Sequence, residues 1–183
     1  MLRQADVVAE IEPARIDESA IKASMLSEGV SPRDVADCLA DLKAKKIASR
    51  YPQALVLGSD QVLEVGGEIL DKPPSMEAAG EQLKSLRGRT HTLHSAAVIY
   101  ENARPVWRHV GQAKLTMRDF SDQFVEAYLT RNGSGLLATV GSYKIEEGGA
   151  VLFSRIEGDY FSILGMPLLE VLAFLRTRGL AQE

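Results

Sequence analysis

The sequence has few of the features that mark secreted or membrane proteins. Its 183 residues include one cysteine, Cys38, which excludes an intramolecular disulfide framework and a cysteine zinc site. The setting of Cys38 in VADCLADL predicts a thiol on the buried side of a helix. No apolar run approaches the ~20 residues that span a bilayer. Charged residues also interrupt the stretch where a signal peptide needs an apolar core: Arg3, Asp6, Glu10 and Glu12. We therefore expect a reduced, soluble, cytoplasmic protein with no membrane partner.

Neither sign of charge is in excess. The 21 basic and 25 acidic residues give a net charge of −4, so no overall positive field favours DNA or RNA, and we expect no nucleic-acid partner. Hydrophobic residues make up 45% of the chain and charged residues 25%, which argues against disorder, collagen and coiled coil. At ~150 residues per domain, the length predicts a single domain over residues 1–183.

The apolar pattern predicts both helices and strands. Ser31 and Pro32 suit the start of a helix over 33–50, and further helices are expected over 76–87, 121–132 and 167–179. Residues 54–58 read as a short buried strand that stops at 59–61. A hairpin over 62–70, strands over 90–100 and 105–117, and a glycine-punctuated β region over 141–164 follow. Because strict βαβ alternation is missing, we expect an α/β or α+β domain with a mixed sheet flanked by helices.

Three positions suggest chemistry. Asp60 is placed just past the end of a buried strand, where a carboxylate acts as a base or holds a cation; an aspartate bonding its own turn is the alternative. Lys72 precedes two prolines that hold the backbone extended, which suits phosphate binding, although a solvated lysine has the same pattern. The Asp17-Glu18 pair suits either metal binding or a helix start.

Other catalytic patterns are missing. His91 and His94 are three apart in a predicted strand, so they face opposite sides and make a two-histidine metal site improbable. The Gly-x-Ser-x-Gly elbow is absent, and the glycines at 133–135 and 148–149 lack the context of a phosphate loop. Carboxylates and lysines remain, which favours metal-assisted phosphoryl chemistry.

Seven short stretches, in order from about residue 10 to the end, resemble the Maf-like nucleoside triphosphate pyrophosphatases. They are Ile16-Asp17-Glu18, Leu39 to Ala44, Gly58 to Val62, Gly67 to Pro73, Gly88 to His91, Gly141 to Glu146, and Ile156-Glu157-Gly158 through Gly165 to Leu168. The resemblance implies a two-lobed single domain of the Maf and ITPase type, with a mixed twisted sheet and a central cleft. It also implies that a homodimer is the expected assembly.

The implied reaction is hydrolysis of a nucleoside triphosphate between its α and β phosphates, which gives a nucleoside monophosphate and pyrophosphate. The implied cofactor is a divalent metal cation, Mg²⁺ or Mn²⁺. Asp60 matches the family's proposed proton acceptor, and Glu18 would hold metal or water. Lys43 and Lys72 would neutralise the phosphates and the leaving pyrophosphate.

Gln61 and Glu146 resemble the branch of the family that acts on 7-methyl-GTP. A carboxylate accepts hydrogen bonds from guanine N1–H and its 2-amino group, and it attracts the positive charge of the methylated ring. Two alternatives stay open. The chain could prefer dTTP and UTP, or it could bind nucleotides without turnover, as a protein linked to cell division or as a folded remnant.

The expected beginning of the family pattern is missing from the sequence. Family members start with a strand and a Ser-x-Ser-Pro-x-Arg-Arg loop that contacts the phosphates, whereas this chain starts at Met1-Leu-Arg-Gln. We expect the loop's backbone donors and arginine to be lacking, which weakens triphosphate binding. A start codon assigned too late is the favoured explanation, and a truncated, inactive form is the alternative.

Overall fold

The computed structural model describes residues 1–182. Five strands form one sheet in the order β2-β1-β3-β4-β5. The strands are β1 (Val56–Val65), β2 (Glu68–Leu70), β3 (Thr90–Glu101), β4 (Arg104–Met117) and β5 (Phe153–Gly158). The α-helices are α1 (Glu18–Ser27), α2 (Pro32–Ala48), α3 (Met76–Leu86), α4 (Asp122–Asn132), α5 (Tyr160–Ile163) and α6 (Leu168–Thr177). Among residues 1–182, no helix has both the length and the apolar character needed to cross a membrane.

The expected α/β domain, a sheet flanked by helices, is confirmed, but its four strand pairings are all antiparallel rather than mixed. Two of these pairings are hairpins, in which the chain reverses direction within a few residues and neighbouring strands must run oppositely. Gly66 and Gly67 close the β1–β2 hairpin with φ values of 63° and 88°, a region open to glycine at no steric cost. Asn102 and Ala103 close the β3–β4 hairpin.

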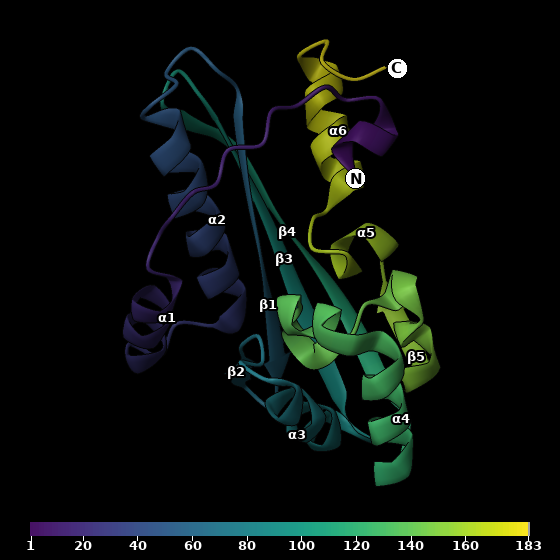
Figure 1. The fold of residues 1–183 in the computed structure, drawn as a ribbon. Helices are drawn as coiled ribbons and strands as arrows, with labels where there is room; N and C mark the ends of the chain where they lie inside the picture. The colour runs from purple at the N-terminus through teal and green to yellow at the C-terminus, as the bar shows by residue number, and fades with distance from the viewer. Residues whose placement is uncertain (183) are drawn as a thin grey trace.

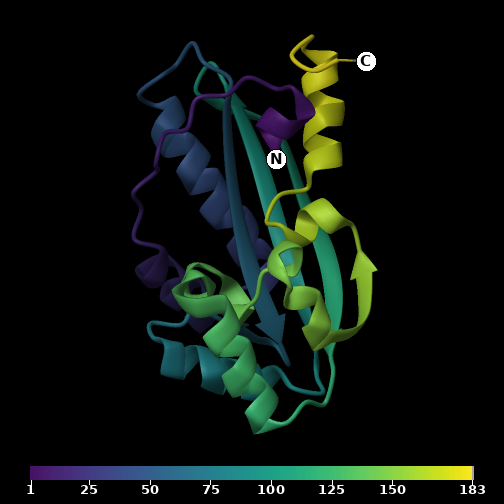
Figure 2. The ribbon, with the colours of Figure 1, turned by 45° about the vertical axis from the view of Figure 1, so that its right-hand side comes forward.

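The two faces of the sheet are covered differently. Figure 1 shows α2 on one side of the sheet and α6 on the other, with α3 and α4 at the lower end. Helix α2 packs on Val56 and Val62 of β1 and on Ala96 and Val98 of β3. The opposite face carries one apolar cluster around α6 and another around α3 and α4, which agrees with the expected two-lobed domain. After a 45° turn, Figure 2 shows β5 at the outer edge of the sheet.

The predicted helix starts are confirmed by their caps. The side chain of Ser31 accepts a hydrogen bond from the backbone N–H of Asp34 at 3.2 Å. Ser75 caps α3 and Ser121 caps α4 in the same way, three residues before the N–H that each accepts. Each serine satisfies an N–H that has no partner within its helix.

The prediction that a strand ends at Ser59 is wrong, because β1 continues through residues 59–61 and places Asp60 in its middle. The polar side chains are tolerated there because each has a partner. Ser59 donates to the carbonyl oxygens of Ala96 and Gly165. Asp60 accepts from Lys43 of α2, and Gln61, on the opposite face of the sheet, donates to the carbonyl oxygen of Ser162. Three polar residues in a row are typical of a turn, but these distant partners allow them inside a strand.

The predicted β region over 141–164 is also largely wrong. Short 3₁₀ turns fill the first part of this region and the residues before it: η2 (Gly133–Ala138), η3 (Val140–Ser142), η4 (Ile145–Glu147) and η5 (Gly149–Leu152). Gly141 and Gly148 have φ values of 80° and 98°, which interrupt any extended run. Only β5 is a strand, and α5 follows because Asp159 accepts hydrogen bonds from the N–H groups of Phe161 and Ser162.

Cys38 lies on α2 and is half-buried, so the expected core thiol is instead near the surface. Burial raises the pKa of the thiol, and the charges of Asp41 and Asp37 raise it further. A raised pKa leaves little thiolate at neutral pH, which agrees with an unreactive cysteine.

Candidate active site

Three of the four predicted catalytic residues meet in one ionic cluster. Lys43 Nζ of α2 lies 2.5 Å from Asp60 Oδ1 in the middle of β1 and 2.7 Å from Glu18 Oε1 at the start of α1. Asp17 fixes the beginning of α1, because its side chain accepts a hydrogen bond from Ala20 N–H at 3.0 Å. Residues separated by up to 42 positions thus share one ammonium group.

The close approach of α2 to β1 makes this cluster possible. A Cβ atom at Gly58 would lie 2.6 Å from the backbone nitrogen of Ala44 and would also clash with the carbonyl oxygen of Ala40. Glycine at this position therefore lets the turn of α2 that carries Lys43 lie directly against β1. The glycine in the family-like stretch Gly58-Ser-Asp60 is thus explained by the close packing of α2 on β1.

Burial and charge act on this cluster in opposite directions. Burial raises the pKa of Asp60, whose side chain is 7% exposed, more than the hydrogen bond and charge of Lys43 lower it. Burial alone would lower the pKa of Lys43, but the hydrogen bonds and charges of Asp60 and Glu18 outweigh it and raise that pKa. The result is a carboxylate with more basic character than an ordinary aspartate, held against a lysine that stays protonated.

Lys72 is exposed and forms no ion pair within residues 1–182, so the structure does not bring it into the cluster. Its neighbour Asp71 does connect this segment to α1, since Lys22 Nζ lies 2.6 Å from Asp71 Oδ1. Lys22 is one turn beyond Glu18 on α1, and its charge lowers the pKa of Asp60. Sequence reasoning missed Lys22, although the four-residue spacing from Glu18 was a usable signal.

The two predicted specificity residues share a second location. Gln61 and Glu146 both line a small cavity of about 70 Å³, together with Tyr143, Lys144 and Ile163. Lys144 Nζ lies 3.0 Å from Glu147 Oε2, and the side chain of Glu146 is exposed. The cavity therefore combines acceptor groups with one cation at its rim.

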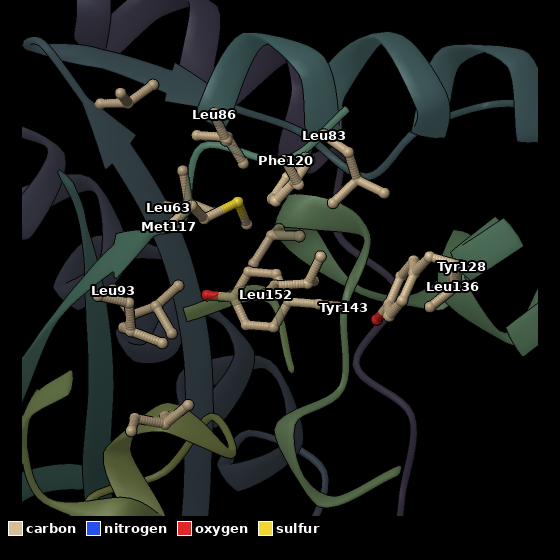
Figure 3. Close-up of a cluster of buried hydrophobic side chains, with 14 of the residues drawn as sticks. Leu63, Leu83, Leu86, Leu93, Met117, Phe120, Tyr128, Leu136, Tyr143 and Leu152 are labelled. Atoms are coloured by element: carbon tan, nitrogen blue, oxygen red, sulfur yellow. The ribbon is translucent and has the colours of Figure 1, made fainter. Parts of the chain in front are cut away.

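The loop that carries Glu146 is anchored by buried contacts. Tyr143 OH lies 2.8 Å from His91 Nε2 on β3, and Ser142 Oγ donates to Gln82 Oε1 on α3 at 2.7 Å. Figure 3 shows the ring of Tyr143 in the middle of the apolar cluster around α3 and α4, beside Leu152. Burial lowers the pKa of His91 to about 4, so this histidine is neutral at pH 7. The loop is thereby held in one conformation next to the cavity.

The ionic cluster and the cavity lie on opposite faces of β1, because consecutive side chains of a strand alternate. Strand β2 pairs only with residues 63–65 of β1, whereas β3 pairs with residues 56–64 along the other edge. Within residues 1–182, the second edge of residues 56–62 therefore pairs with no strand. This unpaired edge is where the two faces of β1 that carry Asp60 and Gln61 come together.

The carboxylates of the ionic cluster are possible ligands for a metal ion. Among residues 1–182, no three histidine, cysteine, aspartate or glutamate side chains converge as an all-protein metal site. Mg²⁺ is commonly held by one or two carboxylates together with substrate phosphates and water. Glu18, whose side chain is 41% exposed, and Asp60 supply two carboxylates on one ammonium, so the residues fit a cation held jointly with a phosphate ligand.

Comparison with known proteins places this arrangement in a family. The family model described as "Maf-like protein" matches residues 1–178. A nucleoside triphosphate pyrophosphatase of Ruegeria sp. (strain TM1040) is 48% identical over 183 residues, which cover 100% of this chain and 92% of that protein. The protein of the same name from Ruegeria pomeroyi is 51% identical over 179 residues, 98% of this chain and 90% of the relative.

A third relative carries a narrower name. The 7-methyl-GTP pyrophosphatase of Mesorhizobium japonicum is 49% identical over 179 residues, again 98% of this chain and 90% of the relative. Matches of this extent leave no part of the described fold outside the similarity. The chain therefore belongs to the Maf-like protein family.

Proposed function

We propose that this protein hydrolyses a nucleoside triphosphate between its α and β phosphates, giving a nucleoside monophosphate and pyrophosphate. The observation that carries the proposal is the bridge from Lys43 to both Asp60 and Glu18, which sets a basic carboxylate and a cation beside the open edge of β1. The names of the relatives support the same reaction.

Asp60 is the proton acceptor in this proposal. Its carboxylate takes a proton from a water molecule whose oxygen attacks the α phosphorus, and the bond to the bridging oxygen of the β phosphate breaks. The electron pair of that bond leaves with pyrophosphate. Because burial raises the pKa of Asp60, its carboxylate is a stronger base than a solvated one. Lys43 stabilises the negative charge that develops on the phosphates.

Three further groups assist. Lys22 and Lys72 flank Asp71 and add positive charge for the β and γ phosphates. Glu18 would hold a divalent cation, Mg²⁺ or Mn²⁺, together with phosphate oxygens; when bound, this cation neutralises phosphate charge. Before substrate arrives, Lys43 and Lys22 are both paired with carboxylates, so the phosphates compete with these partners for each lysine.

The proposed substrate is 7-methyl-GTP or a closely related modified guanine nucleotide. Gln61 and Glu146 line one cavity, and a carboxylate in this position suits the N1–H and 2-amino donors of guanine and the positive charge of the methylated ring. The name of the Mesorhizobium relative agrees with this choice. A preference for dTTP or UTP is the competing outcome.

The experiment is a substrate panel. Purified protein is incubated with 7-methyl-GTP, GTP, dTTP and UTP, with and without Mn²⁺, and the products are identified by ³¹P NMR. We expect monophosphate and pyrophosphate, fastest from 7-methyl-GTP and dependent on the metal. Release of inorganic phosphate and a diphosphate would contradict the proposed bond. Tight binding without turnover would support the non-enzymatic alternative instead.

A further inference from the structure

The amide of Gln61 is held in one orientation by the opposite face of the sheet. Its Nε2 donates to the carbonyl oxygens of Ser162 at 2.9 Å and Ile163 at 3.1 Å. These carbonyls lie at the end of α5, and that of Ser162 also accepts a hydrogen bond from the backbone N–H of Gly165 at 3.2 Å. Because a carbonyl oxygen only accepts hydrogen bonds, the group of Gln61 that faces α5 must be its NH₂.

Ser95 on β3 enforces the same orientation. The Ser95 hydroxyl donates its one proton to the carbonyl oxygen of Ser162 at 2.6 Å. Its oxygen can then only accept from Gln61, and it does so from Nε2 at 2.9 Å. Ser95 is fully buried, so water cannot take over this role. A flipped amide would set the Gln61 oxygen against the two carbonyl oxygens and would take the Ser95 proton away from Ser162.

The consequence for the cavity is that Gln61 offers only one kind of group. The hydrogen bonds of its side chain within residues 1–182 all run through Nε2 and none through Oε1, and Gln61 lines the cavity beside Glu146. Two acceptors, the Oε1 atom and the Glu146 carboxylate, thus face a bound base. Guanine has adjacent donors at N1 and the 2-amino group, whereas hypoxanthine keeps N1–H and lacks the amino group.

We propose that Ser95 is a positioning residue for base selection: by fixing the amide of Gln61, it makes the cavity require a guanine 2-amino group. The proposal rests on the proposed function, since it assumes that the cavity holds the base of a nucleotide. It assigns a role to a buried serine that has no contact with the ionic cluster around Lys43.

The test measures binding, so that it does not depend on turnover. Dissociation constants for the α,β-methylene analogues of GTP and ITP are determined by calorimetry for wild type, Ser95→Ala, Gln61→Met and the double variant. We expect wild type to prefer the guanosine analogue and Ser95→Ala to lower this preference about fivefold, the worth of one ordinary hydrogen bond. In the Gln61→Met background, Ser95→Ala should change nothing further.

Ser59→Ala is the matched control. Ser59 also bonds the segment after α5, donating to the carbonyl oxygen of Gly165 at 3.0 Å, but within residues 1–182 its hydrogen bonds do not involve Gln61. We expect Ser59→Ala to lower the melting temperature about as much as Ser95→Ala does, but to leave the preference for the guanosine analogue unchanged.

Three results would overturn the proposal: equal binding of the two analogues by wild type, no binding of either, or the same effect of Ser95→Ala with and without Gln61. Failure of the proposed reaction is seen separately. It would show as missing pyrophosphate in the substrate panel, whereas these binding constants report only on the base.

Discussion

Asp60 and Gln61 are neighbours in the sequence, yet they lie in two different environments on the two faces of β1. Asp60 faces α2 and α1, where it is held by Lys43, a lysine on a flexible stem that also bonds Glu18. Gln61 faces α5, where two backbone carbonyls and a buried serine fix its amide. The Asp60 face offers charges that a ligand can rearrange, and the Gln61 face offers a polar group already set in place.

In the proposed function, this dipeptide of β1 serves chemistry on one face and recognition on the other. Alternation of side chains sends one residue to each face, and the edge of residues 56–62 that pairs with no strand within residues 1–182 lies between the two. Phosphate chemistry needs cations that exchange partners. Base selection needs groups that do not rotate, because a rotating amide accepts either pattern of donors and acceptors.

The largest expected effect is on the ionic face. Asp60→Asn keeps the shape of the side chain and removes its basicity, so we expect the rate of pyrophosphate release to fall about 10²- to 10⁴-fold. Asp41→Asn is the control. Asp41 lies on α2 and is a carboxylate paired with a cation, Arg108, but it is outside the ionic cluster. A rate for Asp60→Asn within tenfold of wild type would remove Asp60 as the base.

The face of the sheet that carries Gln61 and the contact between His91 and Tyr143, here called the anchored face, should make the stability of the protein depend on pH. His91 has a pKa of about 4 in the folded protein, below the value of about 6.5 in an unfolded chain, because it is buried. The unfolded state therefore binds the proton first. The free energy of unfolding should fall by about 3 kcal/mol as pH drops from about 6.5 to about 4, and this loss should be absent in His91→Phe.

Urea unfolding of both proteins between pH 7 and pH 4 measures this difference. His109→Phe is the control, since His109 lies beside Trp107 near α6, away from the Tyr143 anchor. If wild type and His91→Phe lose stability in parallel on acidification, the anchored face does not depend on a neutral His91.

The base preference should respond to Glu146. In Glu146→Gln, a neutral amide replaces the carboxylate, so the ratio of kcat/KM for 7-methyl-GTP over UTP should fall about tenfold. Glu147→Gln is matched in position and chemistry, but its carboxylate is bound by Lys144 and does not line the cavity. An unchanged ratio in Glu146→Gln would remove Glu146 from base selection.

The smallest effect is expected at Lys22. Lys22→Met should raise the KM for the triphosphate about fivefold with little change in kcat, because one phosphate contact is lost. Asp71→Asn should act in the opposite direction, since it frees Lys22 from its present partner. Lys84→Met, which removes a lysine paired with Glu81 on α3, controls for the loss of charge. Equal effects of Lys22→Met and Lys84→Met would contradict a specific contact.

The sequence predicted what local rules determine. Ser31, Ser75 and Ser121 each marked a helix start, since a cap depends on residues within one turn. The glycine pair after β1 marked a hairpin for the same reason. The resemblance to a family, rather than periodicity, grouped Glu18, Lys43 and Asp60, and contacts between distant segments then brought these three together.

What failed depended on partners far along the chain. Asp60 was expected after a strand because three polar residues in a row resemble a turn. Partners distant in the sequence, such as Lys43, Gly165 and Ser162, make these residues acceptable within β1. Ser95 carried no signal, because one serine in an apolar strand has no pattern. The spacing from Glu18 could have pointed to Lys22, but its bond to Asp71, 49 residues away, had no local signal.

The proposed function requires one nucleotide to contact both faces of β1 across its unpaired edge. A crystal structure with the α,β-methylene analogue of 7-methyl-GTP shows where the nucleotide binds. We expect the base in the cavity beside Gln61 and Glu146 and the α phosphate next to Asp60 and Lys43. A base bound elsewhere, or phosphates held away from Lys43, would contradict it.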